Sequence, residues 1–279
     1  MASRSSPSGK PTREPQERSA ETLIYGRNPV REALRGRRRV HAVLLACAAG
    51  SEPDRELTAW SHIPASARGN RPTPKIERVS PAELTAKLGT PDHQDIAALV
   101  DPYPYVDEGQ LLRTHTLLIA LDQIQDPHNL GAIIRTAEGA GAGVLITRHR
   151  AADVTAAVVK ASAGATEHAL VSRVRNLADF LSNAKKAGFW IYGAAAGAEQ
   201  SYSSQDYTYP TCFVMGSEGE GLGRRVASFC DVPVSLPLAG RVSSLNVSVS
   251  AGILLYEAVR QREQAAGGRT GPRAEGSEP

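Results

Sequence analysis

Two polar residues in the segment 121–137 are candidates for a functional site. The segment is Leu-Asp-Gln-Ile-Gln-Asp-Pro-His-Asn-Leu-Gly-Ala-Ile-Ile-Arg-Thr-Ala, which indicates a strand, an Asp-Pro turn and then a helix. Asn129 lies near the start of that helix, and Arg135 lies almost two turns further on. An Arg on a largely apolar helix needs a polar partner if it is partly buried. Arg135 is therefore a candidate functional residue, whereas Asn129 is either a functional amide or an ordinary helix N-cap.

A second segment, 213–222, suits the binding of a ligand by backbone. Its sequence, Phe-Val-Met-Gly-Ser-Glu-Gly-Glu-Gly-Leu, runs from an apolar strand into a Gly-rich turn that contains Gly216 and Glu218. Such a turn lets backbone amides approach a ligand closely at the carboxyl end of a sheet. The turn lacks the Gly-Lys-Ser/Thr of a nucleotide phosphate loop, and the Gly-x-Gly-x-Gly at 139–143 follows a helix instead of a strand. The first observation disfavours a phosphate-loop nucleotide site, and the second disfavours a Rossmann dehydrogenase.

A third segment, 236–252, places small and hydroxyl residues at the start of a predicted helix. Its sequence is Leu-Pro-Leu-Ala-Gly-Arg-Val-Ser-Ser-Leu-Asn-Val-Ser-Val-Ser-Ala-Gly, and it includes Leu236, Ser244, Leu245 and Asn246. Small residues permit the close approach of a second surface. A Ser-rich capped helix is the simpler alternative, but it does not explain Asn246, a poor helix former one step inside the predicted helix.

The second half of the chain alternates strands and helices, which predicts a parallel sheet with helices on both faces. The predicted strands are 117–121, 144–147, 169–171, 190–193, 212–215 and 232–236, and the predicted helices are 130–141, 154–162, 177–187 and 245–262. In the first half we expect strands at 40–47 and 96–100. A helix there is expected to be capped by Asn28 and to begin at Pro29.

Proline-rich and polar stretches divide the chain into five parts. The stretch 101–109 has two prolines among polar residues and aromatics, so we place the domain boundary there, while 69–74 is a loop. The predicted parts are a disordered tail (1–20), a first domain (21–100), a linker (101–115), a second domain (116–263) and a second disordered tail (264–279).

The basic residues indicate a polyanionic partner more by their kind than by their number. The formal net charge is only +3, but 26 of the 32 basic residues are Arg. The planar Arg side chain suits bidentate phosphate contacts, although a GC-rich genome would give the same bias. Arg27, Arg31 and Arg35 share one side of the first predicted helix, and Arg38 belongs to the Arg37 to Arg39 run that follows. These arginines predict either an RNA-binding face or a solvated helix face.

Several function classes are disfavoured by composition. Three cysteines without a Cys-x-x-Cys spacing argue against a disulfide framework and a zinc site, and we expect no metal. No apolar run approaches a membrane span, and the first 20 residues are unlike a signal peptide, which predicts a cytoplasmic protein. His128 is the only histidine near the proposed site, and we interpret it as structural.

The three segments resemble, in order and separation, the signature motifs of the SpoU branch of the α/β-knot (SPOUT) RNA methyltransferases over about 116–262. The sequences Tyr-Gly-Arg-Asn-Pro-Val at 25–30 and His-Gln-Asp-Ile-Ala at 93–97 resemble the amino-terminal domain of the subgroup that modifies 23S ribosomal RNA guanosines. Asp95 and the loop 69–74 depart from that pattern. The resemblance implies an α/β fold, with a carboxyl-terminal trefoil-knotted parallel-sheet methyltransferase domain and a smaller α/β RNA-binding domain.

The resemblance also implies a function, a cofactor and a site. It implies an S-adenosyl-L-methionine-dependent RNA 2′-O-ribose methyltransferase, working as a homodimer on ribosomal RNA, most of all on a guanosine of 23S ribosomal RNA. The residues it assigns are Gly216, Leu236 and Leu245 to the cofactor, and Asn129, Arg135, Glu218, Ser244 and Asn246 to the catalytic positions. Arg135 is expected to grip phosphate, with the general base left open. A transfer RNA ribose methyltransferase and a non-catalytic ribosome-assembly factor are the alternatives.

Overall fold

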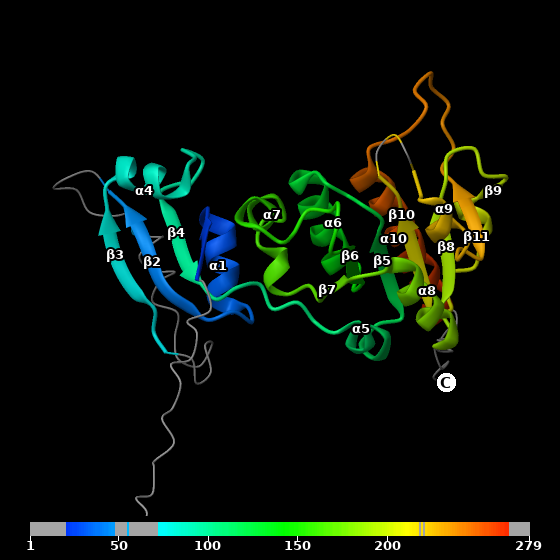
Figure 1. Ribbon diagram of the computed structural model, residues 1–279, viewed down its shortest axis with the longest axis horizontal. Helices are drawn as coiled ribbons and strands as arrows, with labels where there is room; N and C mark the ends of the chain where they lie inside the picture. The colour runs from blue at the N-terminus through cyan, green and yellow to red at the C-terminus, as the bar shows by residue number, and fades with distance from the viewer. Residues whose placement is uncertain (1–20, 48–54, 56–71, 218, 220, 268–279) are drawn as a thin grey trace, which may run out of the picture.

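Two β-sheets organise the chain in the computed structural model, which describes residues 21–47, 55, 72–217, 219 and 221–267 (Figure 1). The first sheet has four strands in the order β1-β4-β2-β3, and the second has seven in the order β7-β6-β5-β10-β8-β11-β9. All strand pairs of the second sheet are parallel. The prediction of a parallel-sheet α/β domain behind a smaller α/β domain is therefore confirmed. Both predicted tails, apart from 264–267, lie outside the described residues.

The first domain is a mixed sheet with one helix on each face. Its elements are β1 (Thr22–Tyr25), α1 (Arg27–Arg35), β2 (Val40–Ala46), β3 (Lys75–Val79), α4 (Pro81–Leu88) and β4 (Ile96–Val100). The strands predicted at 40–47 and 96–100 are confirmed. Asn28 is not the cap of α1, because the helix begins at Arg27 behind Gly26, whose backbone φ of 100° suits glycine. Strands β1 and β3 and helix α4 were not predicted.

The second domain buries both faces of its sheet, as its nearly continuous apolar strands require. Its strands are β5 (Leu117–Leu121), β6 (Gly143–Thr147), β7 (Val171–Val174), β8 (Trp190–Ala194), β9 (Gln200–Ser201), β10 (Thr211–Met215) and β11 (Val232–Ser235). Its helices are α5 (Glu108–Thr114), α6 (Pro127–Gly139), α7 (Ala156–Ala161), α8 (Leu177–Lys186), α9 (Arg224–Ala227) and α10 (Val247–Gly267). Alternate strand residues pack against α6, α7 and α10 on one face and α5, α8 and α9 on the other.

Three predicted boundaries in this domain are wrong. Helix α10 begins at Val247 instead of 245 and continues to Gly267, so 264–267 are helical instead of a tail. The predicted linker contains helix α5, whose N-cap is Asp107. The strand expected at 169–171 lies at Val171–Val174, because a short 3-10 helix occupies Ala165–Glu167. In each case the apolar or polar character of the sequence continues past the residue at which the helix or strand begins or ends. Capping residues and local turns, and not the hydrophobic pattern, determine that residue.

The two domains share one hydrophobic core and a buried ion pair. Helix α1 packs on α7, and the core on that side of the first sheet continues into the second domain. Between them, Arg38 Nε donates to Glu167 Oε2 at 3.0 Å, and the two side chains are 2% and 0% exposed. Arg37 donates to the backbone oxygen of Ala169 at 2.6 Å. The prediction that Arg38 binds RNA is therefore wrong, because domain docking buries its guanidinium.

We expect the Arg38→Ala substitution to lower the free energy of unfolding by about 3 to 5 kcal/mol, because it leaves the Glu167 carboxylate buried without its partner. Urea unfolding of the full chain measures this loss. Arg39→Ala is the matched control: Arg39 is exposed, and its removal is expected to change stability by no more than about 0.5 kcal/mol. Equal stability of the two variants would contradict the structural role given to Arg38.

Candidate active site

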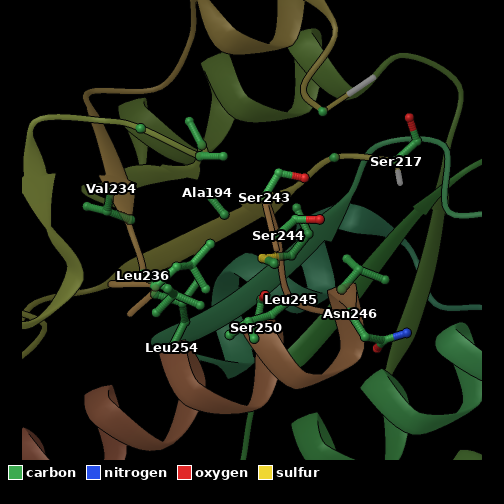
Figure 2. A pocket seen from close by; sticks show the side chains of 18 of the residues that line it. Ala194, Ser217, Val234, Leu236, Ser243, Ser244, Leu245, Asn246, Ser250 and Leu254 are labelled. Carbon is green, nitrogen blue, oxygen red and sulfur yellow. The ribbon is translucent and has the colours of Figure 1, made fainter. Parts of the chain in front are cut away.

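A cavity of about 710 Å³ opens at the carboxyl ends of β8, β10 and β11 (Figure 2). Ligand sites of open parallel sheets lie at this edge. The cavity is lined by Ala194, Ala195, Ala196, Gly197, Met215, Gly216, Ser217, Gly219, Gly221, Val234, Leu236, Leu238, Ser243, Ser244, Leu245, Asn246, Val247, Ser250 and Leu254. Figure 2 shows Leu236 and Leu254 on one side of it and Ser217 and Asn246 on the other. The cavity thus has an apolar side and a polar side.

The Gly-rich turn after β10 forms one wall of this cavity. Ser217 and Gly221 exchange two backbone hydrogen bonds, of 3.1 and 3.0 Å, which fold the turn back on itself. A Cβ at Gly216 would lie 2.1 Å from the backbone carbonyl carbon of Gly221, so only glycine fits there. Gly219 and Gly221 have positive φ angles of 92° and 68°. The turn therefore depends on its glycines for its shape, as its sequence predicts.

Asp122, at the end of β5, anchors this turn. Its buried carboxylate accepts a hydrogen bond from the backbone N of Gly223 at 2.9 Å, and its own backbone N donates to the Met215 oxygen at 2.8 Å. The two ends of the Gly-rich turn are thus tied to the neighbouring strand. Asp122 was not predicted as a site residue, although a carboxylate directly after an apolar strand, next to the predicted site, was a usable signal.

A hydrogen bond joins the first and third motif segments. Asn246 Nδ2 donates to Asn129 Oδ1 at 2.9 Å, across 117 residues of sequence. Asn246 also caps α10, because its Oδ1 accepts from the backbone N of Ser248 at 2.8 Å, so it is not inside the helix as expected. Asn129 is buried within α6, whose cap is Asp126. The N-cap alternative for Asn129 is therefore wrong, and its amide faces the site.

The remaining predicted residues divide into two groups. Gly216, Leu236, Leu245, Ser244 and Asn246 all line the cavity. Arg135 does not line it: the side chain is exposed on α6, almost two turns beyond Asn129. Glu218 lies outside the described residues.

A second cavity, of about 630 Å³, adjoins the first and is mainly polar. It is lined by Gln123, Ile124, Gln125, Asp126, Asn129, Arg150, Ser217 and Val247. Ser217 and Val247 line both cavities. The hydrogen bond between Asn246 of the first and Asn129 of the second lies at their junction. Two ligands bound in the two cavities would therefore meet beside this pair of amides.

Two buried thiols, the grouping of possible metal ligands and the apolarity of the helices are further features of the described part of the chain. Burial raises the pKa of the Cys230 thiol to about 11 and that of the Cys212 thiol still further, so both are protonated near neutral pH. Among the described residues, no three His, Cys, Asp or Glu side chains lie together as metal ligands. None of the described helices combines the length and apolarity of a membrane span.

Family models match most of the chain in two parts. Residues 116–256 match the model described as the SpoU rRNA Methylase family. Residues 23–106 match the model described as RNA 2′-O ribose methyltransferase substrate binding. The two matches fall on the two domains of the structure.

Relatives and solved structures agree with these matches. The chain is 42% identical to an uncharacterised tRNA/rRNA methyltransferase of Mycolicibacterium smegmatis. The match covers 86% of this chain and 76% of that relative. A Synechocystis relative with the same description is 40% identical, but the match spans only 64% of that protein. The SpoU methyltransferase AviRb of Streptomyces viridochromogenes, solved with AdoMet, is 28% identical, with a TM-score of 0.72, over 88% of this chain and 92% of that one.

Proposed function

The chain belongs to the SpoU rRNA methylase family, and on this premise we propose that it transfers a methyl group from S-adenosyl-L-methionine to a ribose 2′-hydroxyl of RNA. The observation that carries the proposal is the cavity at the sheet edge, where Gly216, Leu236 and Leu245 lie together as the family pattern implies. We propose a guanosine of 23S ribosomal RNA as the target.

The residues of the cavity fit this cofactor. Its apolar side, with Leu236 and Leu254, suits a purine ring, and the backbone of the turn after Gly216 offers polar groups to a ribose and an amino acid moiety. The trefoil knot expected from the family resemblance brings the segments after β10 and β11 together around such a ligand. When bound, the cofactor supplies an electrophilic methyl group on a sulfonium.

The chain's own polar residues then orient the acceptor. The paired amides of Asn129 and Asn246 fix the junction of the two cavities, and Ser244 adds a hydroxyl to the lining of the first. Orientation of this kind contributes up to about 7 to 11 kcal/mol in well-aligned systems. Arg135 stabilises negative charge on phosphate and on the oxygen that loses its proton, as a permanent cation.

A homodimer explains the position of Arg135. Arg135 and Gly139 lie one turn apart on α6, and a Cβ on Gly139 would lie 3.0 Å from the Tyr256 hydroxyl of α10. Tyr256 and Val249, two turns apart on α10, are each 51% exposed. We propose that a second copy covers this surface of α6 and α10 and that Arg135 reaches the partner's site.

The first domain supports RNA as the substrate. The three other predicted arginines, Arg27, Arg31 and Arg35, lie on α1, whereas the buried Arg38 lies beyond its end. The Arg35 side chain is 57% exposed. We propose that they hold structured RNA by its phosphates. Methylation of ribosomal and transfer RNA in parallel with labelled cofactor decides between the two substrates: label in ribosomal RNA alone supports the proposal, and label in transfer RNA alone contradicts it.

We expect calorimetry with S-adenosylhomocysteine to show one binding site per subunit, because one such cavity is formed by each chain. The same titration with NAD is expected to give no heat of binding, since the dinucleotide phosphate motif is absent. Binding of NAD without binding of S-adenosylhomocysteine would overturn the assignment of the cavity.

A further inference from the structure

We propose that the second cavity binds the acceptor nucleotide of the RNA, with Arg150 holding a phosphate and Gln123 donating to or accepting from the base or sugar. This inference rests on the proposed methyl transfer to RNA and gives a role to Arg150 and Gln123, to which the family pattern described above assigned none. The second cavity lies where the acceptor must bind, next to the proposed cofactor cavity, because Ser217 and Val247 line both.

The backbone at two lining residues is strained. Gln123 and Arg150 have φ angles of 61° and 54°, in the left-handed region that non-glycine residues rarely adopt. The described residues include five such non-glycine positions, and two of them line this one cavity. Strain of this kind persists where the surrounding structure holds a side chain in a required position, as at ligand sites.

The chemistry of the lining matches a nucleotide. Arg150 is exposed and forms no ion pair with any of the described residues, so its guanidinium is available for the bidentate contact that phosphate favours. The amides of Gln123 and Gln125 can each donate and accept, as base edges and ribose hydroxyls require. Among the described lining residues only Ile124 and Val247 are large and apolar, so the lining suits a nucleotide better than an apolar peptide segment.

Hydrogen bonds within the chain hold the two loops that carry Gln123 and Arg150 in place. They follow the neighbouring parallel strands β5 and β6, and the backbone N of Ala152 donates to the Ile124 oxygen at 2.9 Å, which ties one loop to the other. The Tyr105 hydroxyl holds the far end of the second loop, accepting from the backbone N of Val154 at 2.8 Å. Gln123 and Arg150 are thus held in the lining of the cavity before RNA binds.

The test compares Arg150→Ala with Arg148→Ala in the full chain. Arg148 is in the same loop, but its Nε donates to the backbone oxygen of Arg173, away from the cavity. Binding of unmodified 23S ribosomal RNA and bulk transfer RNA is followed by fluorescence anisotropy without cofactor at several salt concentrations. We expect Arg150→Ala to weaken the better-bound RNA about tenfold and to lower the salt slope by about one unit. Arg150→Lys should restore part of both, and S-adenosylhomocysteine affinity should not change.

A second variant separates the amide of Gln123 from its backbone. Gln123→Gly accepts the positive φ and removes only the side chain, so we expect a higher KM for RNA, an unchanged Tm and unchanged S-adenosylhomocysteine affinity. If Arg150→Ala binds RNA as tightly as wild type with the same salt slope, this inference is wrong while the proposed function stands. A wild-type chain that transfers no methyl group to either RNA would instead defeat the proposed function.

Discussion

Arg135→Ala is expected to lower methyl transfer to RNA by at least about 100-fold, the size of effect seen when a single group that stabilises transition-state charge is removed. S-adenosylhomocysteine affinity should stay close to wild type, because Arg135 is exposed on α6 and does not line the larger cavity. Single-turnover kinetics and calorimetry measure the two quantities separately. Arg135→Lys keeps the charge but loses the planar fork, so its activity separates an electrostatic role from bidentate phosphate geometry. Wild-type turnover by Arg135→Ala would refute the role given to this residue.

Gly216→Ala is expected to weaken S-adenosylhomocysteine binding by at least about 100-fold, because the Gly-rich turn must move to admit a methyl group 2.1 Å from the Gly221 carbonyl carbon. The fold should survive, since the turn lies at the sheet edge, and circular dichroism checks this. Gly240→Ala is the control, because a Cβ there meets no atom within 4 Å. Wild-type affinity in Gly216→Ala would show that the turn does not hold the cofactor.

Mixing these two variants tests the proposed dimer. If Arg135 serves the partner's site, a mixed dimer of Arg135→Ala and Gly216→Ala chains has one intact site, and random exchange restores about a quarter of wild-type activity. If Arg135 serves its own chain's site, every site in the mixture carries a lesion and activity stays near zero. The exposed apolar surface of Val249 and Tyr256 on α10 leads us to expect restoration.

The sheet and the Gly-rich turn could be predicted from sequence because their signals are local. Leu117–Leu121 is apolar throughout and Thr211–Met215 is apolar after its first residue, as buried parallel strands require. The pairing of Asn129 with Asn246 could not be predicted, because it joins residues 117 positions apart and depends on how α6 meets α10. The motifs identified both asparagines, but only the fold shows that they bond to each other.

The arginines of the first domain show a second limit of sequence patterns. Spacing of four places Arg27, Arg31 and Arg35 on one side of a helix, but it does not show what covers the residues that follow. Arg38 is buried against Glu167, which lies 129 positions further along the chain. A basic run that follows an arginine-bearing helix can thus serve the docking of domains.

Mapping the methyl group within the modified RNA tests the central claim most directly. RNA methylated by the purified protein with labelled S-adenosyl-L-methionine is digested to nucleosides, which are separated and identified by mass spectrometry. The account predicts label in a 2′-O-methylated nucleoside, with 2′-O-methylguanosine from 23S ribosomal RNA as the main product, and its loss with Arg135→Ala. Label on a base, with the ribose unmodified, would contradict it.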